Sequence, residues 1–142
     1  MKSNKFSIKL FNNKFADYIL FLEAATYTMW AFLMIRIFSF KRYIHWIKNP
    51  SKNKDNNQES LRVLYTINRV KKYSFWPTTC YTEAIAARII LKRKGIRSQI
   101  YFGVRKDEHK KLHAHAWTKV NEKIITGQGN LDLFKVIYIF DD

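Results

Sequence analysis

The sequence predicts an α+β fold, in which helices come first and a small antiparallel sheet follows. Up to residue 94 the apolar residues recur at helical spacing, whereas from Ile96 they alternate with polar residues, as in strands. The chain has 142 residues, 47% of them hydrophobic, which suffices for one compact core and is short for two ordinary domains. We expect a single domain over 1–142, made of an N-terminal helical region (1–48), a mobile loop (49–60), and a helix followed by the part that carries the chemistry (61–142).

The longest apolar stretch predicts a first helix over residues 16–38. Within it, residues 18–35 contain only one charged side chain, Glu23, and approach the length of a membrane span. Asp17 and Glu23 argue against a span, as does the polar segment 26–28, because these groups are costly in hydrocarbon. We expect a helix that is buried in the core or that makes a peripheral membrane contact through 16–38.

Two more helices are predicted after a short amphipathic stretch at 41–47. The second covers 61–72, with Ser60 placed to cap its first turn. The third runs from Cys80 to Lys94, because Pro77 and Thr78–Thr79 mark a sharp entry and Gly95 supplies the left-handed residue that ends it. This third helix is expected to lie on the sheet.

The remaining chain predicts four strands. Charged residues 105–111 form an exposed connection after the first strand, and Asn121–Glu122 form a tight hairpin turn, since Asn121 tolerates positive φ. The strands are expected at Ile96–Val104, His113–Val120, Lys123–Thr126 and Phe134–Phe140.

Composition limits the function classes. The chain has 26 Lys and Arg against 11 Asp and Glu, a net charge of +15, which attracts acidic peptides, nucleic acids or anionic lipids alike. The basic residues are scattered over the whole length, so a nucleic-acid-binding module or a membrane-associated interaction protein without catalysis remain only alternatives. A single cysteine excludes an internal disulfide, and no signal peptide is recognisable, so we expect a cytoplasmic protein.

Cys80 is the candidate nucleophile. It lies at the start of a predicted helix, where unpaired N–H groups and the helix dipole favour a thiolate. The alternative is an inert core thiol, because Cys80, Ala84, Ala87 and Leu91 follow helical spacing.

Two histidines form the second candidate feature. Alternation on a strand places His113, His115 and Trp117 on one face. An imidazole beside a thiol takes its proton and later protonates the leaving amine, as in thiol hydrolases. Polar surface is one alternative, and zinc binding by His113, His115 and Cys80 is another. Three ligands at most, with no acidic residue between 112 and 121, make a metal site the weaker reading.

A third group would orient the imidazole. If Asn121 and Glu122 are the two turn residues, His115 falls opposite Gln128, whose amide oxygen can accept from the other ring nitrogen. Asp132 is the reserve candidate. Gly127 and Gly129 beside Gln128 could equally serve only a turn.

The segment PTTCYTEAIAARIILKRKGIRSQIYFGV, followed by HAHAW and then by ITG, resembles the leader peptidases of lasso peptide biosynthesis. These B proteins, in their stand-alone protease form, are a branch of the transglutaminase-like cysteine protease superfamily. IRIFSFKRYIHWI also resembles the N-terminal region of that family, so the resemblance covers most of the chain. It implies a transglutaminase-like or papain-like core with Cys80 as nucleophile and His115 as general base and acid. The orienting aspartate of the family falls here on Gly127, next to Gln128.

The resemblance also implies a reaction and partners. The enzyme would hydrolyse one peptide bond of a ribosomally made precursor, releasing the amino terminus that an ATP-dependent lasso cyclase joins into a macrolactam. The implied partners are the leader region of the precursor peptide, a separate leader-recognition protein (the RiPP recognition element) and the cyclase. No cofactor, metal or nucleic acid is implied.

Overall fold

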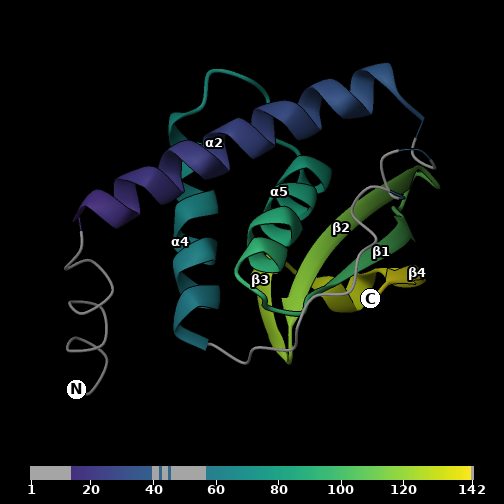
Figure 1. Cartoon of the computed structure of the whole chain (residues 1–142). Helices are drawn as coiled ribbons and strands as arrows, with labels where there is room; N and C mark the ends of the chain where they lie inside the picture. The colour runs from purple at the N-terminus through teal and green to yellow at the C-terminus, as the bar shows by residue number, and fades with distance from the viewer. Residues whose placement is uncertain (1–13, 40–41, 43–44, 46–56, 142) are drawn as a thin grey trace.

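The computed structural model describes residues 14–39, 42, 45 and 57–141 (Figure 1), and within them it confirms the predicted α+β arrangement. The predicted stretch at 41–47, apart from two residues, and the predicted loop up to residue 56 lie outside the described residues. The elements are α2 (Lys14–Ile37), α4 (Asn57–Tyr73), α5 (Cys80–Arg93), β1 (Gln99–Lys106), β2 (Leu112–Val120), β3 (Lys123–Thr126), the 3-10 turn η1 (Leu131–Leu133) and β4 (Lys135–Phe140).

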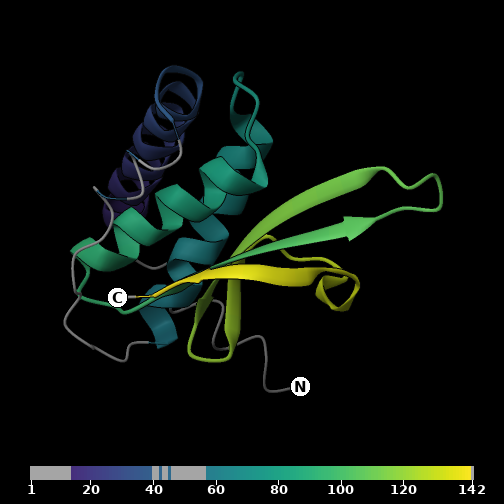
Figure 2. The ribbon, with the colours of Figure 1, turned by 90° about the vertical axis from the view of Figure 1, so that its right-hand side faces the viewer.

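The four strands form one antiparallel sheet in the order β3-β2-β1-β4. Helix α5 lies on one face of this sheet, and in both Figures 1 and 2 it lies between the sheet and α2. The β2–β3 hairpin turns at Asn121, whose φ is 52°, and Val120 pairs with Lys123 as predicted. The β1–β2 hairpin extends away from the helices (Figure 2).

Helix α5 is the centre of the core because it is buried on both sides. Its small residues Ala84, Ala86 and Ala87 are at most 1% exposed, and they let a helical layer and the sheet approach closely. Toward the other helices, apolar residues of α2, α4 and α5 form one cluster. Toward the sheet, the cluster consists of Ala84, Ile100, Phe102, Ala116 and Phe140, with Cys80, Tyr81 and Ile89 packed against it.

Both ends of α5 are where the sequence predicts them. Thr79 is the N-cap of a capping box. The backbone N–H of Thr82 donates to the Thr79 hydroxyl, and the backbone N–H of Thr79 donates to the Thr82 hydroxyl. At the other end Gly95 adopts a φ of 75°, and the N–H of Ile96 donates to the Leu91 carbonyl at 2.8 Å in a Schellman motif. Cys80 is therefore fixed as the first residue of the helix.

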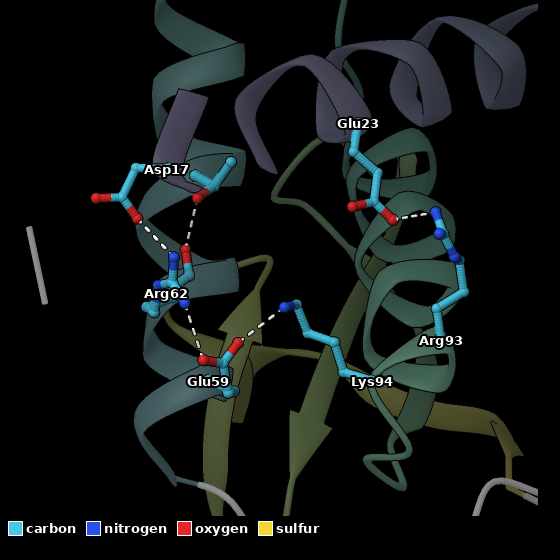
Figure 3. A network of polar contacts seen from close by, with 7 residues as sticks. Asp17, Glu23, Glu59, Arg62, Arg93 and Lys94 are labelled. Atoms are coloured by element: carbon cyan, nitrogen blue, oxygen red, sulfur yellow. Dashed lines mark hydrogen bonds and ion pairs between the residues drawn. The ribbon is translucent and has the colours of Figure 1, made fainter. Parts of the chain in front are cut away.

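Two predicted element starts are wrong by three residues or more, and β1 runs on to Lys106 instead of ending at Val104. Helix α4 begins at Asn57, so Ser60 is a buried residue inside the helix rather than its cap. Glu59 explains the extra turn, because it pairs with Arg62 at 2.9 Å and with Lys94 at 2.8 Å (Figure 3). Strand β1 begins at Gln99 instead of Ile96, since the preceding residues complete the end of α5.

The acidic residues of α2 are paired with arginines of other helices (Figure 3). Asp17 accepts from Arg62 of α4 at 2.7 Å, and Glu23 accepts from Arg93 of α5. These pairs fix α2 onto the other helices. They also mean that neither carboxylate lacks a partner, which the sequence alone does not reveal.

Candidate functional site

Cys80 is half-buried at the start of α5, with its thiol free of any disulfide. Its side chain packs against the apolar cluster between α5 and the sheet, next to Tyr81, whose ring stacks on Phe102 at 5.9 Å. Helix position and partial exposure suit a nucleophile, and the apolar contacts also match the alternative of a core thiol.

His115 is half-buried on β2, where it belongs to an aromatic cluster. Its ring lies 5.9 Å from Trp117 and 5.1 Å from Phe134, measured between ring centroids. Its Nε2 atom lies 2.9 Å from the carbonyl oxygen of Gly127, a hydrogen bond in which the ring nitrogen donates. The imidazole is therefore held both by the neighbouring aromatic rings and by the main-chain carbonyl of Gly127.

Cys80 packs on the side of the sheet that α5 covers, whereas the His115 side chain points to the other side. Ala116 packs in the cluster beneath α5, and the Thr118 hydroxyl donates to the Ala84 carbonyl of α5 at 3.4 Å. Because side chains alternate along a strand, His115 and Trp117 point to the other face of the sheet, as predicted for a shared face. No hydrogen bond or ring contact among the described residues joins Cys80 to His115, so their pairing as nucleophile and base stays a prediction.

The main-chain contact of Gly127 with His115 is the feature of the site that sequence reasoning missed. Its φ is +74°, and a Cβ there would lie 2.4 Å from the Ala116 carbonyl oxygen and 2.7 Å from the Trp117 Cβ. Only glycine fits so close to β2, and this approach brings its carbonyl to His115. The residue on which the resemblance places an orienting aspartate is thus a glycine with no room for a side chain. The distance along the chain from His115 was the only signal in the sequence for this contact. A main-chain carbonyl can belong to any residue type, so the residue type does not reveal an acceptor.

The pairing that predicts Gln128 opposite His115 is wrong. A bulge between Thr118 and Lys119 shifts the register, so Thr118 pairs with Thr126 rather than with residue 125. The exposed Gln128 side chain donates instead to the Ile125 carbonyl at 3.2 Å. The reserve residue, Asp132, lies exposed in η1. Neither Gln128 nor Asp132 has a hydrogen bond to His115 in the described structure, so the orienting role of each stays a prediction.

A histidine–carboxylate pair does occur, at His113. Its Nε2 lies 2.8 Å from Asp107, whose other oxygen accepts the backbone N–H groups of His109 and Lys111. The hydrogen bond from His113 is the main cause that lowers the pKa of Asp107 below its ordinary value. The charged 105–111 connection therefore has a defined turn that orients His113, two residues from His115.

No group of three His, Cys, Asp or Glu side chains among the described residues is placed to hold a metal ion.

Three comparisons with known proteins place these residues in context. A family model described as the transglutaminase-like superfamily matches residues 25–139, from the middle of α2 to the end of β4. The match includes both Cys80 and His115. No curated protein and no solved structure matches at a significant level.

Proposed function

Because the chain belongs to the transglutaminase-like superfamily, we propose that it is a cysteine peptidase, with Cys80 as nucleophile and His115 as general base and acid. More specifically, the substrate is a ribosomally made lasso peptide precursor, from which the enzyme removes the leader. The family match over 25–139 is the observation that carries the proposal, since it spans the capped Cys80 helix and the HAW strand.

The reaction follows from the two groups. The imidazole takes the thiol proton, and the sulfur attacks the carbonyl carbon of the scissile peptide bond. The C–N bond then breaks as the imidazolium gives its proton to the leaving amine, which becomes the new amino terminus of the core peptide. Water, deprotonated by the imidazole, hydrolyses the thioester and frees the leader. Backbone N–H groups at the start of α5 stabilise negative charge near the sulfur.

Catalysis requires the imidazole to come within hydrogen-bond reach of the sulfur. Since Cys80 packs on the side of the sheet that α5 covers, and strand alternation points His115 to the other side, we infer that the site is completed by a rearrangement when substrate and partner bind. A change of one residue in the register of a strand turns every side chain to the other face, and β2 already has an irregular pairing at Thr118–Lys119.

The proposed partners are the leader region of the precursor, a separate leader-recognition protein and the lasso cyclase, in the cytoplasm. The net charge of +15 favours an acidic leader or partner. The family match gives no support to the alternative of a non-catalytic nucleic-acid-binding module.

The pH dependence of Cys80 alkylation tests the pair. In the isolated chain we expect the profile to be the same in the wild type and in His115→Ala, because the two side chains are apart. With precursor and leader-recognition protein added, the wild-type profile should shift to lower pH, and His115→Ala should abolish that shift. His113→Ala is the matched control, since it removes an imidazole from the same face two residues away.

Leader cleavage, followed by mass spectrometry, completes the test. Cys80→Ala and His115→Ala should each abolish cleavage while circular dichroism shows a retained fold, and His113→Ala should retain most of it. Cleavage that survives Cys80→Ala, or that the two histidine variants reduce equally, contradicts the proposed mechanism.

A further inference from the structure

Helix α2 has two apolar sides, and only one of them is covered by the protein. Its inner side consists of Leu20, Ala24, Thr28 and Ala31, all buried against α4 and α5. Large apolar side chains on its other side are exposed by 45% to 74%; we call them the outer stripe of α2, and they are Phe15, Tyr18, Ile19, Leu22, Leu33 and Ile37. Figure 2 shows α2 at the edge of the molecule, beyond α5 from the sheet.

The outer stripe is long enough to be an interaction surface. Four of its members lie over residues 15–22 and two over 33–37, on one side of a 24-residue helix that is about 36 Å long at 1.5 Å per residue. Only 22% of the most apolar 18-residue window of α2 is buried, whereas the core helix of a soluble protein is mostly buried. Isolated exposed apolar residues need no explanation, but a row of six large ones on one helix does.

Polar groups of α2 do not oppose an apolar partner. The hydroxyl of Thr26, in the gap of the outer stripe, donates to the Leu22 carbonyl at 2.8 Å and so is already satisfied within the helix. The two carboxylates, Asp17 and Glu23, accept from arginines of α4 and α5 (Figure 3). Docking the outer stripe therefore leaves no carboxylate of α2 without a partner.

Cations at both ends of the helix identify the kind of partner. The sequence has four lysines and no acidic residue over 1–14, and six lysines or arginines and no acidic residue over 36–54. Of these, Lys14 begins α2 and Arg36 lies in its last turn. An apolar row with basic residues at both ends fits the acyl boundary and headgroups of an anionic lipid surface.

The same charges set the orientation. A helix that spans a bilayer carries its basic flank mainly on one side, whereas here both flanks are basic. Leaving the fold to span would also expose the buried inner side of α2. We propose that the outer stripe of α2 docks on an anionic lipid surface, with the helix lying in the plane of the membrane and its inner side still packed on α4 and α5.

Flotation of the purified full chain with lipid vesicles tests this proposal. We expect the protein to bind vesicles of phosphatidylcholine with about one quarter phosphatidylglycerol at least about tenfold more tightly than vesicles of phosphatidylcholine alone. Ile19→Glu, in the outer stripe, should weaken binding about tenfold or more. The matched control is Ile139→Glu on β4, which makes the same charge change at an isoleucine of nearly equal exposure, 46% against 48%.

Further measurements separate the other occupants. Leu22→Gln, which keeps the net charge, should also weaken binding, and circular dichroism should show native helix content in each variant. The bound protein should be released by alkaline carbonate, because α2 does not insert. Equal loss in Ile19→Glu and Ile139→Glu would mean a net-charge effect alone and overturns the proposal. The proposal is also overturned if the chain binds neither kind of vesicle, which is the result expected for a protein partner. It is overturned as well if the bound chain resists release by alkaline carbonate.

Discussion

Replacing Gly127 by alanine tests how β2 is held against the loop that positions His115. A left-handed φ of +74° costs an alanine about 1–2 kcal/mol. The new Cβ, 2.4 Å from the Ala116 carbonyl oxygen, forces a main-chain shift that costs about 1–3 kcal/mol more. We therefore expect Gly127→Ala to lower the free energy of unfolding by about 2–5 kcal/mol. At about 2 kcal/mol per molar, the urea midpoint should fall by about 1–2.5 M.

Two other glycines separate the two costs. Gly129 has a φ of +156° and no atom within 4 Å of an added Cβ, so Gly129→Ala should lose only the backbone part, about 1 kcal/mol. At Gly103 an added Cβ would lie 2.9 Å from the edge of the Trp117 ring, so Gly103→Ala should lose about 1–2 kcal/mol as that ring moves. Urea unfolding followed by circular dichroism gives all three values. If Gly127→Ala costs no more than Gly129→Ala, the close approach of residue 127 to β2 is refuted.

Three further outcomes follow from caps and turns. Thr79→Ala should cost about 1 kcal/mol in urea unfolding, because it removes the side-chain half of the capping box at α5, and Thr79→Ser should keep most of that stability. Gly95→Ala, at a φ of 75°, should cost about 1 kcal/mol, and a loss well below this would contradict the Schellman end. The pKa of Asp107 is lowered when folded, so its stabilising effect is present above its ordinary value of 3.8 and lost as the pH falls below it. Asp107→Asn should therefore destabilise the protein at pH 7, and the stability curves of variant and wild type should converge as the pH falls below 3.8 and through the lowered pKa of Asp107; parallel curves would refute the assignment.

The element types were predictable because local signals agree with one another. Around α5 the proline, the threonine cap and the terminal glycine all indicate the same boundaries, and the hairpin at Asn121 rests on a single strong turn signal. The start of α4 was not predictable in the same way. Glu59 stabilises the extra turn through Lys94, a residue 35 positions along the chain. Such a contact depends on the tertiary fold and leaves no local pattern.

The buried arginine of α5 is a second feature that sequence reasoning could not anticipate. Arg88 is 1% exposed; it donates to the Ser98 carbonyl, and its guanidinium lies 4.5 Å from the centre of the Phe140 ring. In the sequence it is one of many basic residues and reads as surface charge. Its burial connects α5 to the segment before β1 and to the end of β4, which places the helix on the sheet.

Strand alternation correctly predicts that His113, His115 and Trp117 share a face, but it does not say which face α5 covers. Residue size decides this point. Ala116 lies beneath α5 and is fully buried, because a small side chain allows the helix to come close to the sheet. The large rings of His115 and Trp117 need the other face, where Gly103 leaves them room. The packing that stabilises the isolated fold thus holds the imidazole away from Cys80. On the function proposed above, a catalytic pair forms only if binding energy from the proposed substrate and partners offsets the loss of that packing, and the alkylation profile with and without those partners measures this directly.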